Sequence, residues 1–199
     1  MMKHRRTIGV LLLLGMLALM AAAVNAQIET PLPPMNGVML CESAGGTVVT
    51  RYPAIGTNNP ESGMAVFALG KPFCEFTAED GSSISAPLDV LAANGPTLAA
   101  IAYFYPPEFV PDGTTANPSY TYCAQLGGAI NFGAVTAMGS GWVREDDATD
   151  FRTYCVFADG SMIDSFGVFY KSDGTIRGAD LSGVFTWQPG REYRDTFQQ

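Results

Sequence analysis

The chain has 199 residues, of which 47% are hydrophobic and 15% are charged, and its 11 basic and 19 acidic side chains give a net charge of −8. An acidic protein of this kind is poorly suited to nucleic acid and to anionic membrane surfaces, because both present negative charge. We therefore expect no nucleic-acid partner and no electrostatic docking onto membranes.

The first 26 residues have the pattern of an export signal. A basic start is followed by an apolar run at residues 8–20 and by small residues at positions 21–26, which suits cleavage after Ala26. The apolar run is short for a membrane span, and no later segment is long and apolar enough to cross a bilayer. The sequence thus predicts a secreted or periplasmic protein with no transmembrane segment after signal removal.

Removal of the signal changes the chemistry available to the chain. His4 is the only histidine and three of the 11 basic residues lie in the signal, so eight basic and 19 acidic side chains remain, a net charge of −11. Without histidine, residues 27–199 have no Ser-His-Asp or Cys-His nucleophile and no histidine-containing metal site. Acid–base chemistry would fall to carboxylates, tyrosine or lysine. We expect no cofactor and favour a binding module over an enzyme.

A Pro-rich entry at residues 27–35 precedes a first unit, which we place at residues 36–105. It should begin with a helix that carries Cys41 and ends at Gly45-Gly46, because glycine ends helices readily. The further elements expected in chain order are strands at residues 47–50, 64–69 and 73–76 (with Cys74), a turn at Asp80-Gly81, a short helix from Pro87, and an apolar strand at residues 99–105.

A linker at residues 106–116 leads to a second unit at residues 117–188, and a polar tail follows at 189–199. Asn117 is a typical helix N-cap, and Pro118 suits the first helical position. The further elements expected are a helix that carries Cys123 and ends at Gly127-Gly128, strands at residues 129–135, 141–145 and 151–157 (with Cys155), a turn at Asp159-Gly160, an apolar element at 166–170 and a final strand at 183–187.

The two units match in residue type at corresponding positions. Cys41 and Cys123 both begin a Cys-x-x-x-Gly-Gly motif. Cys74 and Cys155 both lie in an aromatic-Cys-x-Phe motif that precedes Asp-Gly-Ser, and the cysteines are 33 and 32 residues apart in the two units. We interpret this correspondence as a tandem duplication. The expected fold class is α+β: two tandem units, each with a short helix packed on an antiparallel sheet.

Four cysteines in an exported chain favour two disulfides, and their spacing alone allows three connectivities. Duplication favours Cys41–Cys74 and Cys123–Cys155, because each ancestral unit would have closed its own bridge. On chain-entropy grounds, closing a loop of this size stabilises a small domain by roughly 3–4 kcal/mol. The alternatives are four free thiols or a metal held by all four cysteines, although no close Cys-x-x-Cys pair is present.

These motifs resemble a small bacterial secreted or periplasmic domain of unknown function that carries a hemolysin label. The second unit matches at Asn117, Pro118, Tyr122, Cys123, Gly127, Gly128, Cys155, Phe157, Asp159, Gly160 and Ser161. The first unit matches at Cys41, Gly45, Gly46, Cys74, Phe76, Asp80, Gly81 and Ser82. The resemblance implies two divergent copies of that domain, with Ile84 and Ile163 in place of a further family cysteine. The label implies a membrane-active protein, yet the chain has no basic amphipathic helix.

The densest run of carboxylates is a candidate calcium site, because Ca²⁺ prefers several hard oxygen ligands in a flexible loop. Its members are Glu145, Asp146, Asp147 and Asp150. The run lacks the spacing of a calcium-binding loop, so a solvated hairpin loop is the simpler interpretation.

Pairs of aspartates and two aromatic-rich segments are further candidate sites, and each also has a simpler structural interpretation. The pairs Asp159 with Asp164 and Asp80 with Asp89 are candidate acid–base carboxylates of a hydrolase, although Asp80 and Asp159 also suit turns. The aromatic-rich segments 103–109 and 166–170 could form a binding platform, but such runs are usually core. We favour a monomeric, non-enzymatic module that binds an unknown protein or glycan. The alternatives are a membrane-active protein and a secreted hydrolase or inhibitor-like module.

Overall fold

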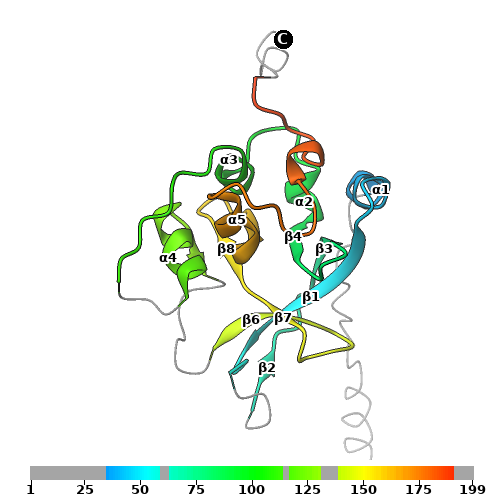
Figure 1. The fold of residues 1–199 in the computed structure, drawn as a ribbon. Coiled ribbons are helices and arrows are strands. Elements are labelled where there is room, and N and C mark those ends of the chain that lie inside the picture. Colours follow the sequence, from blue (N-terminus) through cyan, green and yellow to red (C-terminus); the bar gives the residue numbers. More distant parts are fainter. Residues whose placement is uncertain (1–34, 59–62, 114–116, 131–138, 191–199) are drawn as a thin grey trace, which may run out of the picture.

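The computed structural model describes residues 35–58, 63–113, 117–130 and 139–190. The fold is α+β, with helices packed on curled antiparallel sheets (Figure 1). The helical elements are α1 (Met35–Ser43), α2 (Leu88–Leu91), α3 (Leu98–Phe104), α4 (Pro118–Gln125), α5 (Ser165–Lys171) and the 3-10 helix η2 (Leu181–Gly183). The strands are β1 (Thr47–Ile55), β2 (Ala65–Val66), β3 (Lys71–Thr77), β4 (Ser83–Pro87), β5 (Ala129–Ile130), β6 (Ser140–Arg144), β7 (Phe151–Arg152), β8 (Tyr154–Val156) and β9 (Met162–Asp164).

The larger sheet has six strands and contains segments from before and after residues 106–116. Its order is β4-β3-β1-β6-β7, with β2 paired to β1. The long strand β1 pairs with β3 on one side, where Val48 faces Cys74, and with β6 on the other, where Tyr52 faces Val143. A smaller sheet has the order β5-β8-β9. Strand β1 therefore ties the two halves of the chain into one sheet.

The main core lies between the helices and the sheets, and it holds both disulfides. Its fully buried side chains include Leu88, Leu91, Tyr103, Val168 and Leu181, which come from α2, α3, α5 and η2. Burying a large apolar side chain contributes roughly 1.5–3 kcal/mol. Figure 1 shows α2, α3, α4 and α5 gathered above the larger sheet. Elements from both halves of the chain thus share one core.

Both expected disulfides are present. Cys41 bonds to Cys74 and Cys123 bonds to Cys155, and each bridge joins a helix to a strand of the same half. The four cysteines are fully buried, and the structure contains no free cysteine. The prediction of two bridges is therefore confirmed.

The Gly-Gly motif has the same role beside each disulfide. Gly45 and Gly127 have φ values of +82° and +79°, which favour glycine, and they end α1 and α4. A Cβ atom on Gly46 would collide with Cys74 Sγ, and one on Gly128 would collide with the corresponding sulfur of the other bridge. The first glycine thus turns the chain, and the second lets the following strand pass directly against the disulfide.

The two Asp-Gly-Ser turns hold segments from opposite halves of the chain. In each turn the aspartate Oδ1 accepts a hydrogen bond from the serine backbone N–H, at 2.8 Å in the first turn and 2.9 Å in the second. Ser82 Oγ accepts from the N–H of Gly178 at 3.1 Å, and Ser161 Oγ accepts from the N–H of Ala99 at 3.0 Å. The first turn therefore holds the loop that follows α5, and the second holds the first turn of α3.

The prediction of a strand at residues 99–105 is wrong, because this segment forms α3. Thr97 is the N-cap, and its side chain accepts a hydrogen bond from Ala100 N. The first turn gains two further acceptors from the distant turn at Asp159 and Ser161, which bind the N–H groups of Leu98 and Ala99. Alanine also favours helix, so apolar character alone was a poor guide to a strand.

Other elements differ in extent or type from the sequence prediction. Residues 184–187, expected as a strand, follow the 3-10 helix η2 without strand pairing. Strand β4 was not expected at all, and the strand expected at 64–69 is reduced to the two residues of β2. The strand expected at 151–157 is divided into β7 and β8, which belong to different sheets. The part of the expected strand at 129–135 beyond Ile130 lies outside the described residues.

Arg51 on β1 is fully buried, and its side chain contacts β3, β6 and the segment before β7. Its guanidinium forms ion pairs with Glu75 on β3 and, at 3.0 Å, with Asp150 before β7. It also donates to the backbone oxygens of Trp142 and Asp150 at 3.3 and 2.8 Å. Burial disfavours the charge, but these carboxylates outweigh it and raise the pKa of Arg51 above its ordinary value. We call these residues the Arg51 cluster: Arg51, Glu75 and Asp150.

Within the described residues, no helix has both the length and the apolar character that crossing a bilayer requires.

Candidate functional site

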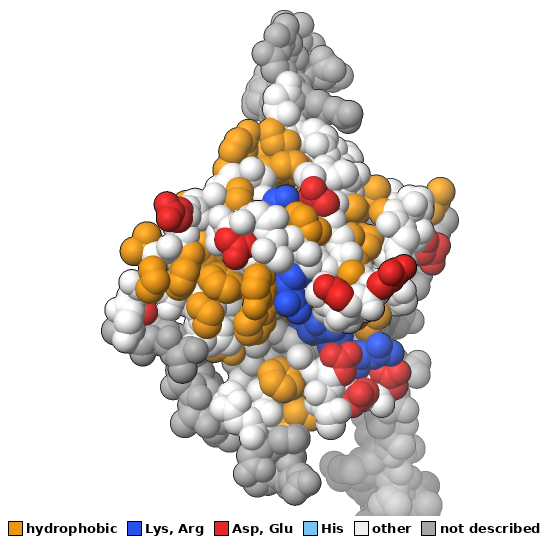
Figure 2. Space-filling model, in the orientation of Figure 1, with side chains coloured by type: hydrophobic (Ala, Val, Ile, Leu, Met, Phe, Trp, Pro, Cys, Tyr) orange, Lys and Arg blue, Asp and Glu red, His pale blue; other side chains and the backbone are white. Residues whose placement is uncertain are grey.

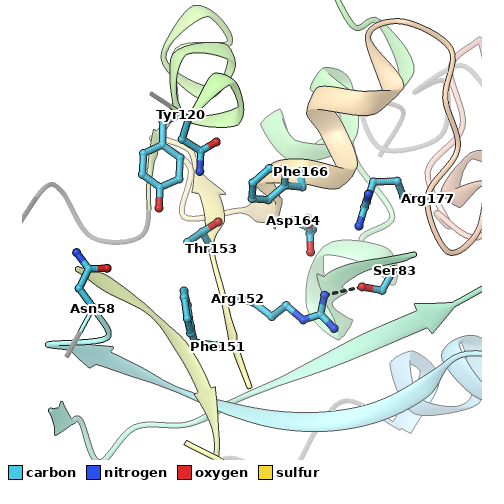
Figure 3. A pocket seen from close by; sticks show the side chains of 10 residues that line it. Asn58, Ser83, Tyr120, Phe151, Arg152, Thr153, Asp164, Phe166 and Arg177 are labelled. Carbon is cyan, nitrogen blue, oxygen red and sulfur yellow. Dashed lines mark hydrogen bonds between the residues drawn. The ribbon is translucent and has the colours of Figure 1, made fainter. Parts of the chain in front are cut away.

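A pocket of about 330 Å³ lies where the two halves of the chain meet (Figure 3). Its charged end is lined by Ser83, Arg152, Asp164 and Arg177. Its other end is lined by Asn58, Asn117, Tyr120 and Phe151. Thr153 and Phe166 lie between that end and Arg177 (Figure 3). On the face drawn in Figure 2, basic side chains form a band next to an area of mainly hydrophobic side chains, and acidic side chains lie on both sides of the band. We refer to this cavity as the arginine pocket.

Segments far apart in the sequence build the arginine pocket. Ser83 begins β4, Asp164 ends β9, and Arg177 lies between α5 and η2. The chain passes from the larger sheet to the smaller one at Thr153, between β7 and β8, so Phe151, Arg152 and Thr153 all line the cavity. The pocket depends on this change of sheet.

The loop that carries Arg177 is held close to the first half of the chain. A Cβ atom on Gly178 would collide with Phe76 O and lie 2.8 Å from Ile84 N. The backbone N–H of Gly178 donates a hydrogen bond to Ser82 Oγ. Gly178 has a φ of +65°, so glycine is favoured for conformation as well as space. The backbone beside Arg177, a lining residue of the pocket, is thereby held in place.

The two arginines of the pocket are incompletely paired. Arg152 donates from Nη1 to Ser83 Oγ, and its Nε lies 3.6 Å from Asp150 Oδ1, an ion-pair distance that is too long for a hydrogen bond. The guanidinium carbon of Arg177 lies 4.9 Å from the centre of the Tyr170 ring. Its Nε is buried without a hydrogen-bond partner, and among the described residues no carboxylate lies within 4.0 Å of its guanidinium. Buried donors of this kind are rare and point to a missing acceptor.

Asp164 is the one carboxylate among the described residues that line the pocket. It is the N-cap of α5, and its Oδ1 accepts a hydrogen bond from Gly167 N at 2.8 Å. Burial raises the pKa of Asp164 to about 6, against the opposing effects of that hydrogen bond and of the charges on Arg152 and Arg177. In Figure 3 the carboxyl group points into the space between the two arginines. Neither arginine comes within 4.0 Å of it, so a gap separates these three groups.

The other end of the pocket is neutral and partly aromatic. Asn117 Oδ1 caps α4 by accepting from the N–H and the hydroxyl of Ser119, at 3.1 and 2.8 Å, so its amide NH₂ is available to another acceptor. Burial raises the pKa of Tyr120 above its ordinary value, against the opposing effect of a hydrogen bond with the Thr153 side chain. The Thr153 hydroxyl is hydrogen-bonded to Ser165 Oγ at 2.7 Å. This end offers hydroxyl and amide groups between aromatic walls.

Some of the residues singled out in the sequence line the arginine pocket, and others have structural roles. Asn117, Asp164 and Phe166 line the pocket, the first two also as helix caps. Asp159 binds backbone N–H groups at the start of α3 and in its own turn. Asp80 accepts a hydrogen bond from the backbone N–H of Ser82 in its own turn, and Asp89 forms an ion pair with Lys71 at 2.7 Å.

The carboxylate run proposed for calcium has other partners in the structure. Asp146 pairs with Arg144 at 2.9 Å, and Asp147 accepts from the backbone and hydroxyl of Thr149 at 2.9 and 2.6 Å. Asp150 belongs to the Arg51 cluster, and Glu145 is exposed. Over the described ranges, no group of three or more His, Cys, Asp or Glu side chains is arranged to hold a metal ion.

The aromatic-rich segments divide between core and pocket. Tyr103 is buried, while Phe104, Phe109 and Phe169 pack against the main core. Phe166 is 37% exposed and lines the pocket, and Tyr105 is 62% exposed. Most of these rings are therefore core residues, as the sequence interpretation favoured.

Sequence reasoning missed the two arginines of the pocket. Arg152 and Arg177 carry no motif and lie in different segments of an acidic chain. The one available signal is their rarity, since only eight basic residues follow position 26. Rarity alone does not show that two arginines meet.

No family model, curated protein or solved structure matches this chain.

Proposed function

We propose that this protein is an exported, non-enzymatic binding module that holds a small anionic ligand in the arginine pocket. The observation that carries the proposal is the pair of arginines at one end of a single cavity, one of them with a buried, unbonded Nε and no carboxylate partner among the described residues. Guanidinium groups bind carboxylates and related anions through two parallel hydrogen bonds. An anionic ligand would complete the hydrogen bonding of Arg177.

The local charge supports an anion despite the acidic composition of the chain. The described residues that line the charged end, two arginines and one aspartate, carry a net charge of +1, whereas the whole chain carries −8. Asp150, 3.6 Å from Arg152, is not a lining residue and also pairs with Arg51. Low-dielectric walls strengthen a charge interaction in such a site. The volume of about 330 Å³ is at the lower end of the usual range for ligand pockets, which favours a small molecule over a polymer segment.

The residues of the pocket support binding better than catalysis. A two-carboxylate hydrolase needs a second acid or base at a separation of about 5–10 Å. Asp164 has no such partner among the described residues that line the pocket. The hydroxyl groups of Ser83 and Thr153 are bonded to Arg152 and Ser165, and neither has a basic partner that would activate it as a nucleophile.

We also infer that the two halves of the chain are divergent copies of one ancestral unit. The matched geometry of the two Gly-Gly motifs and the reciprocal bonding of the two Asp-Gly-Ser turns support this inference. The motif residues shared with the hemolysin-labelled family form caps, turns and disulfides. The resemblance therefore accounts for structural positions, and the membrane-active alternative depends on the label alone.

A titration with simple anions tests the proposed function. Purified protein labelled with ¹⁵N is titrated with phosphate, sulfate and benzoate, and the arginine Nε–H signals are followed by NMR. We expect at least one anion to shift the signals of Arg152 and Arg177 in a saturable manner. Arg177→Gln should weaken that binding about tenfold or more, which is the value of a charge-assisted hydrogen bond.

The matched control is Arg144→Gln, which removes an equal charge from an exposed pair with Asp146 outside the pocket. Its binding should equal that of the parent protein. If no anion shifts the two pocket arginines at millimolar concentration, the proposed function is wrong.

A further inference from the structure

We propose that the arginine pocket selects a monocarboxylate that also carries hydroxyl groups, a sugar acid of the size of glucuronate, over phosphate, sulfate and neutral sugars. This inference depends on the proposed function, because it names the class of anion that the same site would bind. It rests on the arrangement of Asp164 between the two arginines and on the different chemistry of the two ends of the cavity.

The charge balance of the pocket favours a single negative charge. Arg152 and Arg177 contribute two positive charges, and the ionised Asp164 removes one. A monocarboxylate would neutralise the site, whereas a dianion such as sulfate would add a second charge close to a buried aspartate. Like charges in a buried site repel strongly. The planar carboxylate also matches the geometry of a guanidinium better than a tetrahedral anion does.

Asp164 adds a requirement for a hydrogen-bond donor. The carboxylate accepts hydrogen bonds from the backbone N–H groups of Gly167, at 2.8 Å to Oδ1, and of Phe166. Both donors are backbone groups, and neither arginine of the pocket lies within 4.0 Å of it. The side chain is only 4% exposed, so bulk water has little access to it. An ionised carboxylate has about four acceptor sites, so a ligand hydroxyl would supply a further donor, whereas sulfate offers acceptors only. Asp164 therefore discriminates between hydroxylated carboxylates and fully ionised inorganic anions.

The neutral end of the pocket suits the body of a sugar acid. Figure 3 shows Tyr120 and Phe151 at this end, with Asn58 beside them, on the far side of Thr153 from Arg177. A pyranose ring has apolar C–H faces and hydroxyl edges, so it can contact aromatic rings while amides bind its hydroxyls. The amide NH₂ of Asn117 is available for this purpose because only its oxygen is used as the helix cap. A cavity of about 330 Å³ has room for a single ring of this kind.

Competition among matched small molecules tests the selection. Calorimetric titrations of the purified protein compare glucuronate with glucose, which lacks the carboxylate, and with phosphate and sulfate, which lack the sugar. At pH 7.5 we expect glucuronate to bind about tenfold or more tightly than any of the other three. Glucose has no anion for the arginines, sulfate has no donor for Asp164, and phosphate brings a second negative charge close to Asp164.

Asp164→Asn separates the role of the aspartate charge from its role as a helix cap. Asparagine keeps an oxygen for Gly167 N, so α5 retains its cap while the negative charge is lost. The variant should bind glucuronate about tenfold less tightly and sulfate more tightly than the parent, which narrows or reverses the preference. Arg144→Gln, outside the pocket, should keep the preference of the parent protein.

Each outcome bears on one of the two proposals. Phosphate or sulfate binding as tightly as glucuronate would overturn the selection and leave the proposed anion site intact. An unchanged preference in Asp164→Asn would remove the aspartate from the account of selectivity. Absence of binding by all three anions would overturn both proposals.

Discussion

The Arg51 cluster and the arginine pocket show how the same side chain can serve two purposes in one protein. Arg51 is fully buried, and its guanidinium is occupied by Glu75, Asp150 and two backbone oxygens. Arg177 has a buried Nε without a bonded acceptor and, in the described part of the chain, no ion pair. A guanidinium whose nitrogens are all hydrogen-bonded within the protein stabilises the fold. A guanidinium in a cavity with an unbonded N–H group can bind a ligand instead.

The two sites are also linked by one residue. Asp150 forms an ion pair with Arg51 at 3.0 Å and another with Arg152 at 3.6 Å. The carboxylate therefore belongs to the Arg51 cluster and helps to position an arginine of the pocket. The Arg51 cluster and the arginine pocket differ in the number of hydrogen-bond acceptors around the guanidinium, which is larger for Arg51 than for Arg177.

The largest expected effect is on the Arg51 cluster. Arg51→Met should lower the free energy of unfolding by about 3–5 kcal/mol, because it leaves the carboxylates of Glu75 and Asp150 without their buried cation. Urea denaturation followed by circular dichroism measures this loss. A stability close to that of the parent protein would show that the cluster is not structural.

A smaller effect, with a distinct pH dependence, is expected at Asp164. The pKa of Asp164 is about 6 in the folded protein and near 3.8 in the unfolded chain, because burial favours the protonated carboxyl group. The contribution of Asp164 to the free energy of unfolding is therefore fully present below pH 3.8 and is lost as the pH rises through 6. The cost of the buried charge at neutral pH is then about 3 kcal/mol at most.

Asp164→Asn should therefore raise the free energy of unfolding at pH 7.5, and the gain should vanish toward pH 4. Denaturation curves of both proteins across this range provide the measurement. A difference that does not vary with pH would contradict the raised pKa of Asp164.

The smallest effect on stability is expected at Arg177. Arg177→Gln removes a partly exposed charge that has no ion pair among the described residues, so the free energy of unfolding should change by no more than about 1 kcal/mol. Anion binding should nevertheless fall about tenfold. If stability falls as far as in Arg51→Met, the two arginines are alike and the comparison fails.

The parts of the fold that followed from the sequence depend on local rules. Asn117 and Pro118 begin α4, and Gly45 and Gly127 end helices, because capping and positive φ are decided by neighbouring residues. The disulfide pairing followed from the repeated motifs. The aspartates of the two Asp-Gly-Ser turns have the turn roles that their residue type indicates.

The parts that were missed depend on contacts between distant segments. Helix α3 receives acceptors from Asp159 and Ser161, about 60 residues later in the chain, which apolar patterning cannot reveal. The expected strand at 151–157 is interrupted at Thr153, because β7 before it pairs in the larger sheet and β8 after it pairs in the smaller one. Arg152 and Arg177 meet only because β7 and the loop after α5 converge on β4. Of the candidate site, the sequence analysis singled out Asn117 as a helix cap, Asp164 as a candidate acid–base carboxylate and Phe166 within an aromatic-rich segment. It did not bring the three residues together.

The most direct test of the account is the response of the Arg177 Nε–H signal to a small anion. If Arg177 is the unsaturated donor of a binding pocket, its signal should shift and saturate with added glucuronate, while the signal of Arg51 stays unchanged. The opposite result, in which no anion moves the Arg177 signal at millimolar concentration, would contradict the claim that this pocket binds anions.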